Sequence, residues 1–114
     1  MSRAACTPVV EFACYALQGG ERVFGRFVPD PDHPEHTRAL TPADRARVDA
    51  ALAAHASQAH VFGDWRPTHE RWRAAPAYDF TRPAPGEGAL YDGFGWPLTS
   101  ERWRAIAAET LQPA

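Results

Sequence analysis

The most constraining feature of this chain is an aromatic segment interrupted by proline and glycine. Six large aromatic side chains lie in this segment, at Tyr78, Phe80, Tyr91, Phe94, Trp96 and Trp103. Three prolines and four glycines between residues 78 and 97 exclude a continuous helix or a central strand there. Each ring buries about 150–250 Å² when it finds a surface to cover. We therefore expect irregular backbone that needs a scaffold, and the preceding part of the chain offers few elements for one.

The composition sets broad limits on fold and partners. A chain of 114 residues can bury one core, as a small domain or as part of a larger one. Its hydrophobic content of 45% and charged content of 23% are ordinary for a globular protein. A formal charge of −2 gives no reason to expect nucleic acid as a partner. All 12 basic residues are Arg, a bias typical of GC-rich bacterial coding.

Cysteine usage and hydropathy point to the cytoplasm. Cys6 and Cys14 are too few for a disulfide framework and are expected to be buried small hydrophobes under reducing conditions. Pro8 and Glu11 interrupt the apolar stretch before it could serve as the core of a signal peptide. Nothing approaches the ~20 apolar residues of a membrane span. We expect a cytoplasmic protein with no membrane span.

The first part of the chain predicts a β-hairpin. Residues 9–17 (VVEFACYAL) are apolar on both faces apart from Glu11, which is typical of a strand covered on both sides. The turn signal at 18–20 (QGG) then leads into residues 21–28 as the partner strand. Gly25 inside that strand indicates a bulge or a close backbone approach.

Helix signals follow in the remainder of the chain. Thr41 is a good N-cap and is followed by a proline and a first-turn carboxylate, whereas residues 29–38 are expected to be polar loop. A short helical piece is expected at 67–73 with Trp72 as its anchor, and Thr99 caps the final helix. In all, residues 1–114 are expected to form a single or partial domain with strands at about 9–17 and 21–28, a helix at about 42–58, coil at 75–98 and a helix at about 100–111.

One loop has the residue types of a metal site. Residues 30–36 (DPDHPEH) combine the imidazoles of His33 and His36 with three carboxylates, and these groups are competent zinc ligands. The loop is rich in proline and has no visible element to fix ligand geometry, so a solvated charged loop is the favoured interpretation. The carboxylates belong to Asp30, Asp32 and Glu35.

The remaining polar and aromatic candidates favour structural roles. Glu11 in its apolar strand must be paired, and an Arg partner is favoured over a catalytic role. His55 is expected in the core or at a helix edge. His60 and His69 lie near loops, and Ser57 and Ser100 have no nucleophile-elbow context. Four tryptophans could form a sugar-stacking platform, although core packing is favoured for them: Trp65, Trp72, Trp96 and Trp103.

The closing sequence resembles a known enzyme family. YDFTRP at 78–83 and LYDGFGWPLTSERWRAIAAETL at 90–111 are similar to the C-terminal end of the PIG-L (LmbE-like) deacetylases. Residues 40–58 resemble a helix of these proteins and residues 9–17 one of their strands, so the resemblance covers about 9–111. It implies zinc-dependent removal of N-acetyl groups from amino sugars and related amides. The implied fold class is α/β and Rossmann-like, with α+β as the form of an isolated fragment.

The family's catalytic motif has no counterpart in this chain. The A-H-P-D-D-E sequence that supplies two zinc ligands and the general base is absent. Residues 33–36 (HPEH) resemble a later H-P-D-H motif, but they follow the strand at 9–17 that the motif precedes in the family. Leu17 stands where family members have histidine, and residues 84–86 (APG) replace H-P-G. We therefore assign no catalytic, cofactor-binding or metal-binding residue to this chain.

Three functional interpretations follow from these observations. In the first, the chain is a truncated or split deacetylase-family member that is not catalytic alone, and its partner is a second chain carrying the N-terminal half. Alternatively, it is a non-catalytic binding module that pairs with another chain or with itself. The third interpretation is a small metal hydrolase that uses the loop 30–36.

Overall fold

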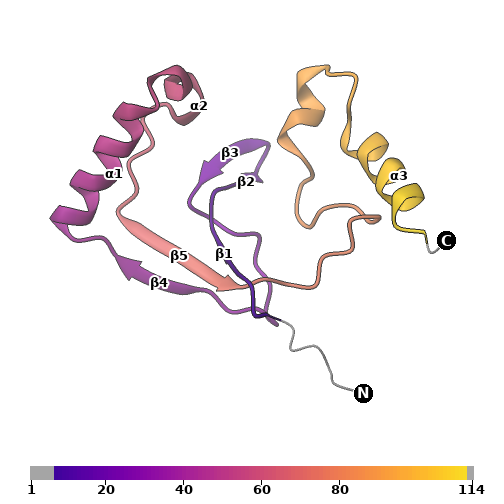
Figure 1. Ribbon diagram of the computed structural model, residues 1–114, viewed down its shortest axis with the longest axis horizontal. Helices are drawn as coiled ribbons and strands as arrows, with labels where there is room; N and C mark the ends of the chain where they lie inside the picture. The colour runs from indigo at the N-terminus through magenta and orange to yellow at the C-terminus, as the bar shows by residue number, and fades with distance from the viewer. Residues whose placement is uncertain (1–6, 113–114) are drawn as a thin grey trace. The chain divides into compact units, whose positions relative to one another are not determined.

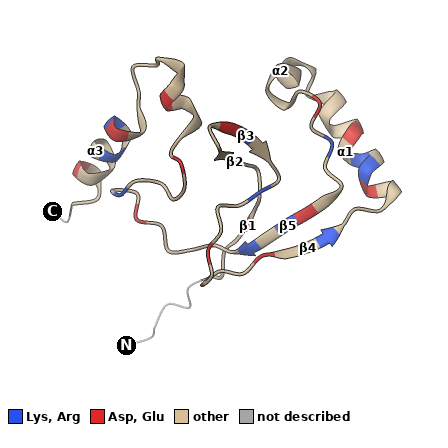
Figure 2. Ribbon diagram, turned by 180° about the vertical axis from the view of Figure 1, so that it is seen from behind, with Lys and Arg blue, Asp and Glu red and all other residues tan. Residues whose placement is uncertain are grey.

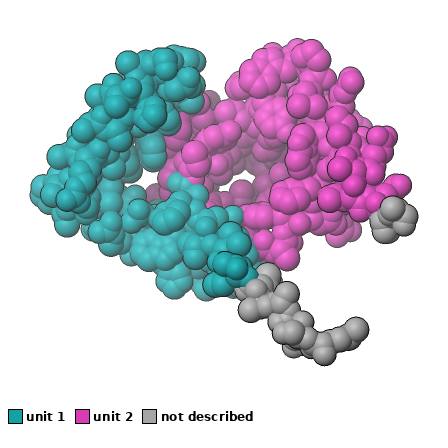
Figure 3. All heavy atoms as spheres, in the orientation of Figure 1, with its two compact units in different colours: residues 1–13, 31–75 teal, residues 14–30, 76–114 magenta. Residues whose placement is uncertain are grey.

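The computed structural model describes residues 7–112, which combine helices and strands in an α+β arrangement. The chain forms two compact units, here called unit 1 and unit 2, and each is assembled from two stretches of sequence. Unit 1 comprises residues 1–13 and 31–75, and unit 2 comprises residues 14–30 and 76–114 (Figure 3).

Unit 1 contains a three-stranded antiparallel sheet. Its central strand is β5 (His69–Ala74), which pairs with β1 (Val10–Phe12) on one side and with β4 (His36–Ala39) on the other (Figure 1). Charged residues of both signs lie along β5 (Figure 2). Since the side chains of a strand lie above and below its sheet, these charged groups must find partners across the sheet or in solvent.

The helical part of unit 1 begins with a capping box. The Thr41 hydroxyl accepts a hydrogen bond from the Asp44 backbone N–H at 3.1 Å, and the Asp44 carboxylate accepts one from the Thr41 backbone N–H at 3.1 Å. This start gives α1 (Pro42–Ala54), whose C-cap is His55. A 3-10 turn over Ala56–Gln58 and the short α2 (Ala59–Phe62) follow, so the expected helix at 42–58 is interrupted after Ala54.

Unit 2 contains the expected hairpin and the expected C-terminal helix. β2 (Tyr15–Gln18) pairs with β3 (Glu21–Phe24) through a Gly19-Gly20 turn in which both glycines have positive φ, 61° and 76°. Positive φ at both central residues is the requirement of the type I′ hairpin turn, which favours Gly-Gly. α3 (Ser100–Thr110) starts at its Thr99 cap, and the intervening coil at 75–98 contains one 3-10 segment, Leu90–Phe94.

The expected strand at 9–17 is wrong as a single element. It is split into β1 and β2, which pair with strands of different sheets. The Ala13 N–H donates to the Arg71 carbonyl at 3.0 Å, whereas the Cys14 carbonyl accepts from the Gly25 N–H at 2.7 Å. Adjacent residues thus bond to different partners, and an apolar run carries no signal for such a change. β3 also ends at Phe24 rather than at 28, because Gly25 takes a positive φ of 66°.

Two further expectations are corrected by the sheet of unit 1. The helix expected at 67–73 is instead β5, and the polar loop expected at 29–38 contains most of β4. Pairing with two neighbouring strands outweighs the weak helical preference of the β5 sequence, as is common for short segments. Trp72 is therefore a strand residue, and its ring stacks on that of His36 at a centroid distance of 5.8 Å.

The most unusual property of the fold is its lack of apolar burial. Among residues 7–112 no apolar side chain is buried, and the only buried residue is Arg73, which is 4% exposed. Phe12 on β1 is 60% exposed, so that strand is not covered on both faces as expected. Cys14 is exposed rather than buried, and Cys6 lies outside the described residues. Within that range, no helix has the length and apolar character needed to cross a membrane.

Candidate functional site

The loop expected to hold metal is not organised as a ligand set. His36 lies on β4 and stacks on Trp72, while the Glu35 carboxylate forms an ion pair with Arg71 at 3.8 Å. Between residues 7 and 112, no three His, Cys, Asp or Glu side chains are grouped so that they could hold a metal ion. The interpretation that uses loop 30–36 as a metal site thus gains no geometric support.

Glu11 has the Arg partner that the sequence predicts. The two side chains lie opposite each other in the β1–β5 register, and the Arg73 Nε donates to the Glu11 Oε1 at 2.6 Å. Arg73 is buried and Glu11 is half-buried. A carboxylate that accepts a short charge-assisted hydrogen bond across two strands is a structural element of the sheet, so the predicted pairing is confirmed.

The other predicted polar candidates lie apart from one another. His55 is the exposed C-terminal cap of α1, whereas His60 is an exposed residue of α2. The His69 Nδ1 and the Thr68 hydroxyl lie 2.9 Å apart at the start of β5. Ser57 is exposed in the 3-10 turn after α1. None of these geometries places an acid, a base and a nucleophile together.

Ser100 belongs to a polar cluster at the beginning of α3. Its backbone N–H donates to the Asp92 Oδ1 at 2.6 Å, and its hydroxyl donates to Asp92 Oδ2. The Arg104 Nη1 donates to the Ser100 hydroxyl oxygen at 3.3 Å. The hydrogen bonds from the Ser100 hydroxyl and backbone lower the pKa of Asp92 below its usual value. This cluster ties the 3-10 segment to α3, and its role is structural.

The four tryptophans are shared between the units. Trp65 and Trp72 belong to unit 1, where they stack on Phe62 and His36 respectively. Trp96 and Trp103 belong to unit 2, where they contact Phe94 and Phe80 edge to face. None of the four is buried, so the expectation that they pack in a core is not met. Trp96 in particular is 58% exposed.

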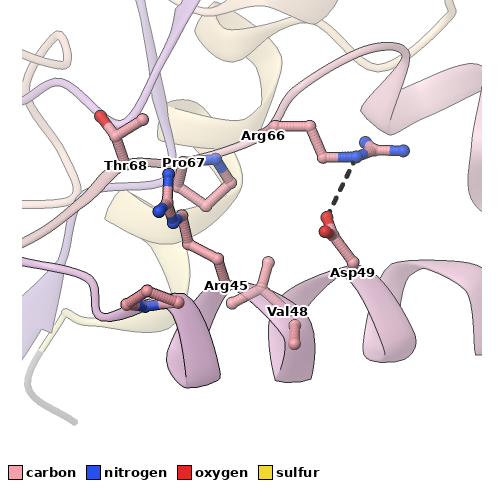
Figure 4. A pocket seen from close by; sticks show the side chains of 8 residues that line it. Arg45, Val48, Asp49, Arg66, Pro67 and Thr68 are labelled. Carbon is pink, nitrogen blue, oxygen red and sulfur yellow. Dashed lines mark ion pairs between the residues drawn. The ribbon is translucent and has the colours of Figure 1, made fainter.

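A hollow of about 390 Å³ lies in unit 1 between α1 and the segment that leads into β5 (Figure 4). The Asp49 carboxylate of α1 pairs with Arg66 Nε at 3.2 Å across one side of it, and the Arg45 side chain extends toward Pro67 and Thr68 on the other. Both partners of the ion pair are more than half exposed. The pair therefore helps to hold α1 near the chain before β5 and does not resemble a desolvated binding site.

A second cavity, of about 260 Å³, lies within unit 2 and is here called the tyrosine pocket. All three tyrosines of the chain line it, although Tyr15 is far from the other two in the sequence. Sequence reasoning missed this grouping because nothing local links the hairpin to the coil. The Pro85-Gly86 pair is the one sequence signal that marks a close approach of the coil to another segment. The lining residues that matter for its chemistry are Tyr15, Leu17, Val28, Tyr78, Glu87 and Tyr91.

Known proteins add no family, relative or fold to these geometric observations. No family model, no curated protein and no solved structure matches this chain.

Proposed function

We propose that this chain is a non-catalytic association module, corresponding to the C-terminal part of a PIG-L-type deacetylase fold. In this proposal it acts together with a polypeptide segment that supplies the metal motif absent from these 114 residues, and it does not hydrolyse N-acetyl amino sugars alone. The sequence resemblance over residues 78–111 supports the family assignment. The observation that carries the association is the lack of any buried apolar side chain among residues 7–112.

The exposed apolar groups are concentrated enough to form contact surfaces. In unit 2, Phe94 and Trp96 lie 5.0 Å apart between ring centroids, and both are more than half exposed. On α3, Trp103 and Ile106 are three positions apart and therefore share a face, and both remain exposed. Removing such area from water stabilises a complex by about 25 cal/mol per Å². A second polypeptide that covers these two pairs of side chains would gain this stabilisation.

Sedimentation and hydrophobic-dye binding of the purified chain test the association. We expect dye binding and concentration-dependent self-association when no partner is present, because exposed apolar surface seeks a cover. Ile106→Glu places a charge on the exposed face of α3 and should reduce both signals. Ala105→Glu adds the same charge at an exposed position of the same helix outside that face, and as the matched control it should leave them unchanged. A monomer that binds no dye and melts cooperatively would contradict the proposal.

The catalytic part of the proposal has a separate test. Acetate release from N-acetylglucosamine derivatives is expected to be absent for the chain alone, with or without added zinc, because the motif that generates a zinc-bound water is missing. Clear turnover that a chelator abolishes would overturn this expectation.

The alternative of a small metal hydrolase is tested by metal content. We expect no tightly bound divalent metal, because loop 30–36 has ligand types without an imposed geometry. One zinc per chain in elemental analysis, lost when both His33 and His36 are changed to Ala, would favour the alternative instead.

A further inference from the structure

The tyrosine pocket brings together three segments of unit 2. Tyr15 and Leu17 come from β2, Val28 follows the hairpin, and the remaining wall comes from Tyr78 and the coil at 84–91. At about 260 Å³ it lies just below the ~300–1,000 Å³ typical of sites for drug-sized ligands, so its occupant is a small group.

A close backbone approach holds the coil against the hairpin segment at this pocket. A Cβ added to Gly86 would lie 2.8 Å from the Val28 Cγ2, and Gly86 has a φ of +84°. Both facts mean that glycine is required there, since any side chain would displace Val28 or strain the backbone. The pocket wall is thus fixed by a specific contact and is more than a gap between loose segments.

The lining chemistry is aromatic with a single charge. Three tyrosines line the cavity, Glu87 is the one charged residue in its described lining, and no Arg lines it although the chain has 12. Aromatic faces attract cations through the ring quadrupole, and several rings around one site recognise quaternary ammonium groups. The exposed Glu87 among the lining residues adds charge complementarity.

We propose that the tyrosine pocket binds a quaternary ammonium group. Such a cation suits the site because it needs no hydrogen-bond acceptors, and the lining offers only one carboxylate and three phenol hydroxyls. A primary ammonium is a compact, strongly hydrated charge, so its transfer from water to an aromatic lining is less favourable. A sugar would require several polar side chains for its hydroxyls, which the aliphatic remainder of the lining does not supply. This inference is independent of the association proposal.

Calorimetric titration of the full chain with tetramethylammonium chloride and with choline tests the site. We expect saturable binding with a Kd in roughly the millimolar range for cations of this size. The neutral isostere of choline, 3,3-dimethyl-1-butanol, has the same shape without the charge and should bind at least about tenfold more weakly. A trimethyllysine peptide tests the source of the quaternary ammonium group. Tighter binding of this peptide than of choline would identify a modified protein as the source.

Matched variants locate the binding in the pocket. Tyr91→Ala should weaken binding of tetramethylammonium by about tenfold, whereas Tyr91→Phe keeps the ring and should retain it. Glu87→Gln removes the carboxylate and should weaken binding less than loss of a ring. Phe12→Ala removes an exposed aromatic side chain of unit 1, outside the pocket, and should have no effect.

Several outcomes would overturn the inference. These are equal binding of choline and its neutral isostere, no saturable binding of either cation at tenfold above the expected range, or equal loss of binding in Tyr91→Ala and Phe12→Ala. Binding of N-acetylglucosamine in place of the cations would likewise assign the pocket to a sugar. Far-UV circular dichroism of each variant confirms that the comparison is between folded proteins. Sedimentation of the same samples separates a binding failure from a change in association.

Discussion

At the scale of single residues, the best-defined interactions of this protein are polar. Two ion pairs join the central strand β5 to its neighbours: Arg73 to Glu11 on β1, and Glu70 to Arg38 on β4. They differ in burial, since Arg73 is 4% exposed whereas the Arg38 side chain is about half exposed. Removing one partner of a buried pair leaves an uncompensated charge, and water compensates for the same loss at the surface.

The two pairs give a direct prediction for stability. Arg73→Ala should lower the unfolding free energy by about 1–3 kcal/mol, because the half-buried Glu11 carboxylate loses the hydrogen bond from the buried guanidinium. Arg38→Ala is the control on the same sheet and should change it far less. Urea denaturation followed by circular dichroism measures both. Equal effects of the two substitutions would contradict the view that burial decides the importance of these pairs.

A second residue-scale prediction concerns acid sensitivity. The folded-state pKa of Asp92 is lowered by its hydrogen bonds with Ser100, below a usual value of 3.8. A lowered folded pKa means that the carboxylate stabilises the fold above its usual pKa and that this contribution is lost as the pH falls through the folded value. Asp44 and Asp79 have lowered pKa values of the same kind, caused mainly by the Thr41 and Thr81 hydroxyls.

The expected result is a stability loss confined to acid. Thermal melts of the wild type should fall in midpoint as the pH decreases below about 4, the range in which the aspartates gain protons. The difference between wild type and Asp92→Asn should shrink over the same range, because the variant has no carboxylate to protonate. Ser100→Ala removes the hydroxyl donor and should reproduce part of the loss at neutral pH. A difference that stays constant with pH would contradict the assignment.

At the scale of elements, the two longer helices and the hairpin each have a local device at one end. Capping by Thr41 and Thr99 starts the two longer helices, and the Gly19-Gly20 turn joins the hairpin. The coil at 84–91 has no such regular pattern. Its place against the hairpin segment depends on Gly86, which combines a positive φ with the close contact to Val28.

Gly86→Ala is therefore expected to destabilise the protein by about 1–3 kcal/mol, through strain at positive φ and collision with the stiff Val28 side chain. Gly93→Ala is the matched control, because nothing lies within 4 Å of its added Cβ and its φ is not positive. That substitution should be neutral or slightly stabilising. Denaturant titrations of both variants provide the measurement, and equal destabilisation would argue against a special role for Gly86.

At the scale of the whole molecule, the absence of a buried apolar core has a thermodynamic consequence. Globular proteins unfold with a heat-capacity increase of about 12–15 cal/mol/K per residue, most of which reports newly exposed apolar surface. No apolar side chain in the described part of this protein is fully removed from water. We therefore expect scanning calorimetry of the dilute chain to give a value well below that range. A rise with protein concentration would show that association completes the core, whereas a normal value for a dilute monomer would contradict the expectation.

The sequence by itself determined the devices that act within a few residues. The helix start at Thr41, the cap at Thr99, the glycine turn and the irregular aromatic coil all depend on neighbours along the chain, so their signals are local. Sequence patterning also required a partner for Glu11, since an unpaired carboxylate among apolar residues is costly.

Only the tertiary structure decided which distant segments meet. The run at 9–17 splits because Ala13 and Cys14 bond to different sheets, and β5 forms because strands on both sides offer it hydrogen bonds. Glu11 and Arg73 are 62 positions apart, and Tyr15 is separated to a similar extent from Tyr78 in the pocket. Strand pairing and pocket formation depend on such non-local contacts, whose partners a single sequence does not specify.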